Sequence, residues 1–163
     1  MPRKPGATTQ ALAAPDENVP LDASLDSLIG YALRRAQLKM FQQLIEDFRP
    51  FDLRPAQFSA LVIIESEPGL MQTDLARALT IEPPQVVTLL NKLESRGLAV
   101  RVRCKPDKRS YGIFLSKAGE VLLKQLKEIA AQSDITATSS LSPVERQQLL
   151  ALLHKVYHNE NAE

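Results

Sequence analysis

The stretch from Gln72 to Leu115 constrains the fold more than any other part of the chain, because two helical patterns and two strand patterns follow one another in it. The first helical pattern covers 72–79 and places its apolar residues on one stripe. Pro83 and Pro84 interrupt it, since proline lacks the amide hydrogen that a helix interior requires but suits the first position of a new helix. We therefore expect a helix, a turn and a second helix.

The second helix is expected to start at these prolines and to end before Gly97, a residue that favours the left-handed conformation found after helix ends. Its apolar residues recur at the spacing of one buried face: Val86, Leu89, Leu90 and Leu93. The opposite face carries short polar and basic side chains, which can reach base edges and phosphates when a helix lies in the major groove. The residues assigned to this DNA-facing surface are Gln85, Thr88, Asn91 and Lys92, together with Thr73 of the preceding helix.

Two strand patterns follow, at 99–103 and 111–115, and the first has the alternation of a half-buried strand. Six Lys or Arg and one acid lie between Arg96 and Arg109, a local charge of +5 in a chain whose net charge is +1. Positive charge gathered on a hairpin beside a candidate recognition helix suits the capture of a phosphate backbone. The hairpin residues assigned to DNA are Arg101, Arg103, Lys105, Asp107, Lys108 and Arg109. The sequence thus predicts a mostly α-helical DNA-binding protein with a small β-hairpin wing.

These motifs resemble the winged helix-turn-helix of the MarR (multiple antibiotic resistance regulator) family. The segments that carry the resemblance are 75–79 (LARAL), 93–98 (LESRGL) and 106–110 (PDKRS), and it extends over almost the whole chain after residue 20. The family's wing contains an Asp-x-Arg pair, so the resemblance implies that Asp107 braces the hairpin and that Arg109 enters or skirts the minor groove. Pro83 and Pro84 replace the small polar residues more usual in the family, and the base contacts of that turn are not carried over to them.

Longer helical patterns flank this region. The helices expected there run from about Ser24 to Phe48, over 56–65, from Lys117 to about Thr136, and from Pro143 onward. The last has the clearest start, because Ser142 and Glu145 have the spacing of a capping box. Val121 is expected on the apolar face of the helix that starts at Lys117.

The terminal helices carry more leucine than one small winged domain needs, which favours a homodimer that covers their apolar faces. The predicted organisation is a disordered arm at 1–20, dimerisation helices at 21–50 and 116–160, and the winged helix-turn-helix at 51–115. Twofold symmetry then implies a pseudo-palindromic double-stranded DNA operator. The alternative is that the first and last helices pack on each other within a monomer.

An effector site is predicted near the junction between the first helix and the winged region. Tyr31, Arg34, Arg35 and Arg54 combine a phenol with several cations, and an arginine binds a carboxylate through two parallel hydrogen bonds. The resemblance implies release from DNA by a small phenolic compound or aromatic carboxylate, in free or coenzyme-A-linked form. In the alternative reading, Arg34 and Arg35 form ion pairs with Glu46, Asp47 or Asp52.

The remaining chemistry-bearing residues give weaker signals. Cys104 is the single cysteine, which suits a reducing cytoplasm, and its basic neighbours leave open a redox-responsive regulator. His154 and His158 are four residues apart on the last helix but have no third ligand nearby in sequence, so no metal site is predicted.

The sequence favours a cytoplasmic, ligand-responsive transcriptional regulator, with repression as the expected effect. It contains none of the phosphate-loop, serine-elbow or histidine metal motifs of common enzymes, and neither a cofactor nor a membrane partner is expected. A winged-helix module that binds protein rather than DNA is the main alternative.

Overall fold

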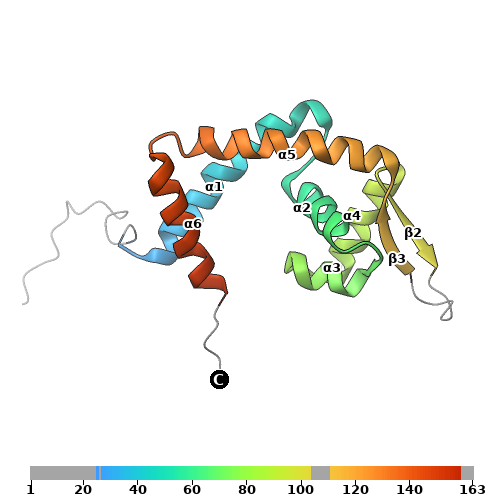
Figure 1. Cartoon of the computed structure of the whole chain (residues 1–163). Coiled ribbons are helices and arrows are strands. Elements are labelled where there is room, and N and C mark those ends of the chain that lie inside the picture. Colours follow the sequence, from blue (N-terminus) through green and yellow to red (C-terminus); the bar gives the residue numbers. More distant parts are fainter. Residues whose placement is uncertain (1–24, 26, 104–110, 159–163) are drawn as a thin grey trace, which may run out of the picture. The chain divides into compact units, whose positions relative to one another are not determined.

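The computed structural model describes residues 25, 27–103 and 111–158 of the 163-residue chain (Figure 1). Its helices are α1 (Ile29–Phe48), α2 (Pro55–Ser66), α3 (Gln72–Leu79), α4 (Pro83–Ser95), α5 (Lys117–Ala137) and α6 (Pro143–Tyr157), with a 3₁₀ turn at Arg49–Phe51. Its strands are β1 (Leu70–Met71), β2 (Ala99–Arg103) and β3 (Tyr111–Leu115). The predicted fold class, mostly helical with a small β-hairpin wing, is confirmed.

The three strands form one antiparallel sheet in the order β1-β3-β2. In its register Arg103 lies opposite Tyr111 and Leu70 lies opposite Ile113. The sequence did not predict β1, because a two-residue strand shows no periodicity of its own. It pairs with β3 after the turn at Gly69, whose φ of 88° suits glycine.

The core that supports the winged region is built mainly from one face of each of the helices α2, α3, α4 and α5, together with β3. Fully buried side chains come from α2, α3, α4, β3 and α5 and include Leu61, Ile64, Leu75, Leu90, Leu93, Ile113, Leu123 and Leu126. Phe48, the last residue of α1, is also fully buried, and its ring lies 5.1 Å from that of Phe58. Lys127 of α5 forms an ion pair with Glu65 of α2. These contacts position α4 and the wing.

Two helix predictions need correction. α1 begins at Ile29 rather than near Ser24, because the preceding residues form a turn in which the Leu28 amide donates to the Leu25 carbonyl over 2.9 Å. The apolar spacing continues through that turn, so periodicity placed the helix start too early. On α5, Val121 is 68% exposed, while Leu123 is fully buried. The buried face of α5 at this point therefore includes Leu123 rather than Val121.

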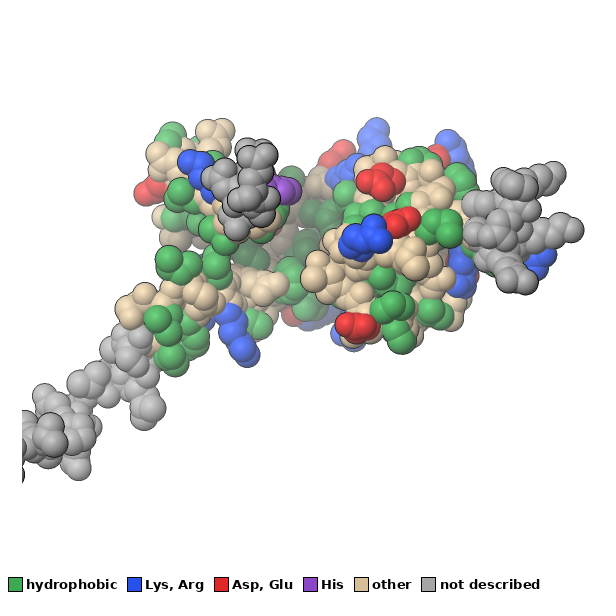
Figure 2. Space-filling view, turned by 90° about the horizontal axis from the view of Figure 1, so that it is seen from below, with side chains coloured by type: hydrophobic (Ala, Val, Ile, Leu, Met, Phe, Trp, Pro, Cys, Tyr) green, Lys and Arg blue, Asp and Glu red, His purple; other side chains and the backbone are tan. Residues whose placement is uncertain are grey.

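Apolar side chains of α1 and α6 lie at the surface of this single chain. The exposed ones are Ile29, Leu38, Phe41 and Ile45 on α1, and Val144, Leu149, Leu150, Leu152, Val156 and Tyr157 on α6. Figure 2 shows hydrophobic side chains reaching the surface in this way. α6 has no buried residue at all, although its Ser142–Glu145 capping box forms as predicted. A search of the described helices finds none that is both long and apolar enough to span a membrane.

Candidate nucleic-acid interface

The turn between α3 and α4 is fixed by backbone geometry. Thr80 adopts the left-handed conformation with φ at 53°, and the Ile81 amide donates to the Ala76 carbonyl over 3.1 Å. Leu75 and Ala76 of α3 are buried, whereas Thr73 and Arg77 are exposed. α3 and α4 therefore form the predicted helix-turn-helix.

The side chain of Gln85 caps the start of α4. Pro83 and Pro84 occupy the first two helical positions, and the Glu82 amide donates to the Gln85 Oε1 atom over 3.1 Å. The sequence placed Gln85 on the DNA-facing surface of this helix. Because the Gln85 side-chain oxygen accepts the hydrogen bond from the Glu82 amide, the NH₂ group of the same side chain is the part that can donate to DNA.

The two faces of α4 are divided as the sequence predicted. Val86, Leu89, Leu90 and Leu93 are buried, and Gln85, Thr88, Asn91 and Lys92 are exposed. The Thr88 hydroxyl donates to the Pro84 carbonyl over 3.1 Å, which orients its oxygen along the helix. The exposed face of α4 thus presents a row of polar groups and one cation.

An open depression of about 400 Å³ lies at the helix-turn-helix. Its lining residues are Ala76, Arg77, Thr80, Ile81, Glu82 and Gln85. It therefore lies beside the first turn of α4, and the residues predicted for an effector site do not line it.

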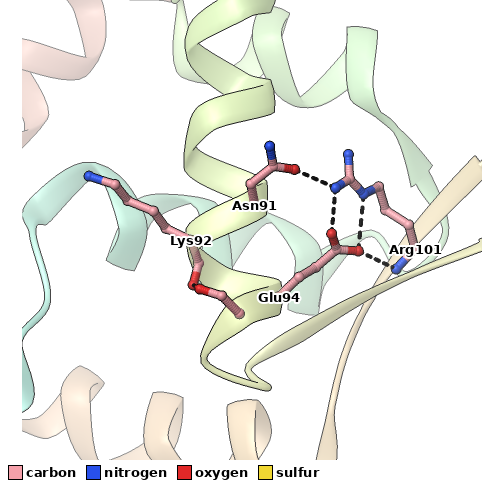
Figure 3. Close-up of polar contacts among 5 residues, drawn as sticks. Asn91, Lys92, Glu94 and Arg101 are labelled. Atoms are coloured by element: carbon pink, nitrogen blue, oxygen red, sulfur yellow. Dashed lines mark hydrogen bonds and ion pairs between the residues drawn. The ribbon is translucent and has the colours of Figure 1, made fainter.

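The last turn of α4 is joined to the wing by a cluster of three polar side chains. Glu94 binds both the guanidinium and the main-chain amide of Arg101, and the guanidinium also donates to Asn91 Oδ1 over 2.6 Å. Figure 3 shows Asn91 and Glu94 pointing toward the guanidinium, while Lys92 points away from it. Because arginine has no acceptor, it is the amide oxygen of Asn91 that faces it.

This cluster decides which face of β2 is turned inward. Ala99 is buried and Arg101 is half-buried beside α4, whereas Val100 and Val102 are exposed. The predicted alternation is present, but an arginine and not a valine occupies the inner side. Hydrogen bonding to Arg101 lowers the pKa of Glu94, and the same bond raises the pKa of Arg101. Both groups therefore remain charged, and one of the wing cations is neutralised locally.

Further along the wing, Arg103 and Tyr111 face each other across the strand pair. The Arg103 Nε atom donates to the Tyr111 hydroxyl over 2.9 Å, and the guanidinium carbon lies 5.6 Å from the ring centroid. Both residues are exposed. This pair holds a cation at the point where the described part of β2 ends.

Several predicted residues lie outside the described part of the chain. They are Cys104, Lys105, Asp107, Lys108 and Arg109 of the hairpin and the arm at 1–20. The hypotheses about the Asp-x-Arg pair and about a redox-active thiol thus stay predictions from sequence.

The residues predicted to bind an effector are placed on two elements. Tyr31, Arg34 and Arg35 lie on α1, where the Arg35 guanidinium carbon is 5.9 Å from the Tyr31 ring centroid. Arg54 is the residue that precedes α2, and its amide donates to Gln57 Oε1 over 3.0 Å.

Two of the acids named in the ion-pair alternative have local partners. Glu46 pairs with Arg49, and Asp47 accepts from the Gln43 side chain. Neither of these partners is Arg34 or Arg35.

The histidine pair at the end of α6 forms an aromatic cluster. The ring centroid of Tyr157 lies 5.5 Å from that of His154 and 4.4 Å from that of His158. Across the described residues, no group of three or more His, Cys, Asp or Glu is placed to hold a metal ion.

Sequence reasoning did not find Glu94, which organises the polar cluster. Its only local signal is an acid in the last helical turn with a basic residue seven positions later, across Gly97, on the first strand. That spacing becomes informative once the angle between helix and strand is known.

Comparison of this chain with known proteins finds similar sequences and structures. A model of the MarR family matches residues 51–110, which include α2, α3, α4 and β2. A protein described as a regulator of the hcr operon in Thauera aromatica is 29% identical over 139 residues, which are 85% of this chain and 84% of that protein.

Two solved structures of the transcriptional repressor CouR are also similar. The structure bound to a 23-mer DNA duplex is 37% identical with a TM-score of 0.79, and the match covers 85% of this chain and 98% of CouR. The structure bound to p-coumaroyl-CoA is 35% identical with a TM-score of 0.74, and the match covers 83% and 95% of the two chains. The similarity therefore spans the helices outside the winged region as well.

Proposed function

This chain belongs to the MarR family of transcriptional regulators, and we propose that it is a repressor that binds its operator as a homodimer and releases it on binding an aromatic acid or its coenzyme A thioester. The main support for DNA binding is the exposed polar face of α4, which Glu94 and Arg101 hold beside a basic wing. Its similarity to CouR bound to DNA supports the same assignment.

In the proposed complex, α4 lies in the major groove. Gln85 and Thr88 lie on its exposed face in the first half of the helix and approach base edges, while Lys92 contacts phosphate. Thr73 of α3 contacts the backbone. Asn91 enters the interface with its amide oriented by Arg101, so Arg101 contributes through this contact while its charge is paired with Glu94.

The wing is proposed to lie along the adjoining minor groove. Arg103, Lys105, Lys108 and Arg109 supply positive charge there, and Asp107 braces the hairpin. The support for this assignment is the concentration of basic residues on one hairpin, together with the strand pair that fixes Arg103 opposite Tyr111.

The homodimer is proposed from the apolar side chains that α1 and α6 expose in a single chain. Surfaces of this kind in a water-soluble regulator are commonly covered by another copy. Two symmetry-related α4 helices would then meet successive major grooves about 34–36 Å apart. The operator is accordingly expected to be a pseudo-palindrome.

The effector is proposed to be a hydroxycinnamate, a hydroxybenzoate or one of their coenzyme A thioesters. The similarity to CouR bound to p-coumaroyl-CoA supports this class. Tyr31, Arg34, Arg35 and Arg54 are the proposed contacts, because a phenol and guanidinium groups match an aromatic anion. For release, the effector must bind the form with low DNA affinity more tightly.

The function is tested by DNA binding and calorimetry on the same protein. Operator fragments selected from a random duplex pool are expected to bind with an affinity that falls steeply with added salt. p-Coumaroyl-CoA, its free acid and benzoate analogues are then titrated with and without operator. Linkage predicts that operator lowers the affinity of the protein for the effector by the same factor by which the effector lowers its affinity for operator. Salt-independent DNA binding would refute the first half, and equal ligand affinity with and without operator would refute the second.

A further inference from the structure

Arg96 joins the end of the candidate recognition helix to the connection between α1 and α2. It follows the last residue of α4, and its guanidinium donates to two main-chain carbonyls, that of Phe51 over 2.6 Å and that of Asp52 over 2.5 Å. The sequence counted Arg96 among the wing cations, but its charged group is directed toward this α1–α2 connection (49–54). Its role therefore differs from that of a cation that faces DNA.

The α1–α2 connection has a geometry that needs such a partner. Asp52 adopts the left-handed conformation with φ at 48°, which costs a residue other than glycine about 1 kcal/mol. The carbonyls of Phe51 and Asp52 lie at the end of the 3₁₀ turn, where backbone acceptors lack helical partners and a cation is favoured. Arg96 satisfies both acceptors, and the planar fork of arginine allows one side chain to do so.

The other side of the same helix end is held by α5. Ser116 caps α5 and donates its hydroxyl hydrogen to the Gly97 carbonyl, and its amide donates to the Leu98 carbonyl over 3.0 Å. Leu98 is buried, and Gly119 packs against its main chain. The segment 96–98 is therefore fixed between the α1–α2 connection and the first turn of α5.

We propose that Arg96 is a positioning residue that couples the α1–α2 connection to the recognition helix. A displacement of the connection is transmitted through the two carbonyl contacts to the end of α4. Arg54, one of the residues proposed to bind the effector, follows the connection's buried Leu53 directly. This inference rests on the proposed DNA-binding function, and it assigns to Arg96 an effect on DNA affinity without a contact to DNA.

The first test compares Arg96→Lys and Arg96→Ala in operator binding over a series of salt concentrations. A lysine keeps the charge but lacks the planar guanidinium that reaches both carbonyls. Both variants are therefore expected to lose at least about tenfold in operator affinity. The slope of log affinity against log salt should stay at the wild-type value, because no phosphate contact is lost. Arg49→Ala is the matched control, since Arg49 lies in the same connection and forms an exposed ion pair with Glu46.

Two results would overturn the proposal. One is wild-type affinity in Arg96→Lys; the other is a salt slope that is shallower by about one in Arg96→Ala, which indicates a lost phosphate contact. If Arg96→Ala does not fold, the lysine variant decides alone.

Hydrogen exchange tests the coupling without DNA. In Arg96→Lys, amide exchange is expected to become faster both at 51–54 and at 94–98, while amides in the middle of α5 keep their wild-type rates. Faster exchange in only one of the two segments, or in neither, also contradicts the proposal. A wild-type protein that fails to bind DNA would refute the proposed function, while the exchange result would still decide whether Arg96 couples the two segments.

Discussion

Glu94 on α4 and Arg101 on β2 are joined by three hydrogen bonds, of which one comes from the main-chain amide of Arg101 and two come from its guanidinium. The main-chain bond fixes the strand and the guanidinium bonds fix the side chain. The angle between α4 and the wing is therefore held by two residues that are close in sequence but belong to different elements. In the proposed complex, α4 and the wing contact two grooves at once, so DNA binding depends on this angle.

The first prediction concerns DNA binding by Glu94→Gln. Removal of an acid near DNA ordinarily strengthens binding to phosphates. Here we expect the opposite, a loss of about tenfold or more, because the wing is no longer held at its angle. Anisotropy titrations with operator measure the effect. Glu120→Gln is the control, since Glu120 forms an exposed pair with Lys117 within one helix and should change affinity little. Tighter binding by Glu94→Gln would contradict the role proposed for the pair.

A second prediction concerns the pH dependence of stability. The pKa of Glu94 is lowered in the folded protein, so the ionised carboxylate stabilises the fold above its unfolded pKa of about 4.3. This contribution is lost as pH falls through the lower folded pKa. The difference in unfolding free energy between wild type and Glu94→Gln should thus be constant near neutrality and shrink in acid. Urea titrations at a series of pH values measure it, and a difference that grows in acid would have the wrong sign.

The third prediction uses two glycines that differ in their surroundings. A Cβ atom at Gly119 would lie 2.0 Å from the Leu98 carbonyl oxygen, and a Cβ atom at Gly30 would meet nothing within 4 Å. Because the atom opposite Gly119 belongs to the main chain, Gly119→Ala must displace the start of α5 or the segment 96–98, at a cost of about 1–3 kcal/mol. Gly30→Ala should be neutral or stabilise by up to about 1 kcal/mol. Equal unfolding free energies for the two variants would show that α5 is not held closely there.

The winged region was predictable from sequence because its signals are local. The prolines that begin α4, the apolar spacing of its buried face and the β-prone segments of the wing all act within a few residues, and the predicted helix and strands are observed. The Ser142 cap of α6 has the same local character and also forms. The terminal apolar faces were predicted as surplus surface, and in the single chain they remain exposed.

The polar contacts that position α4 were not predictable in the same way. Arg96 and Arg101 were both counted as wing cations, yet one binds carbonyls 44 and 45 positions away and the other binds Glu94. A charge count treats all arginines alike, because sequence gives the number of charges but not the direction of a side chain. The contact between Arg101 and Glu94 also determines which side chains of β2 face α4. The alternation of apolar and basic residues alone therefore did not show which face of the strand is buried.

The fourth prediction concerns Arg109, which lies outside the described residues and is assigned from the Asp-x-Arg spacing. Arg109→Ala is expected to weaken operator binding by at least about tenfold, or on the order of 1.4 kcal/mol, without a change in unfolding temperature. Asp107→Ala should have a smaller effect in the same direction, because it removes the carboxylate that is proposed to hold the hairpin but keeps the Arg109 guanidinium. Unchanged affinity of Arg109→Ala at moderate salt rules out the contact.

The last prediction separates two roles of Gln85. Its oxygen accepts from the Glu82 amide at the start of α4, and its NH₂ group is the proposed donor to a base. Gln85→Glu keeps the acceptor and places a negative charge in the first helical turn, so stability should be unchanged or slightly raised. The same variant lacks the donor. We therefore expect its affinity ratio between operator and scrambled duplex to fall by about tenfold or more.

The affinity ratio is the decisive measurement because the added charge repels both duplexes alike, whereas base reading affects the operator only. Lys92→Ala provides the complementary result, since loss of a phosphate contact weakens both duplexes and leaves the ratio unchanged. Gln85→Ala should lower the ratio and also reduce stability by about 1 kcal/mol or less, because it loses the helix-end contact too. If Gln85→Glu keeps the wild-type ratio, Gln85 only closes the helix and a different part of α4 reads the bases.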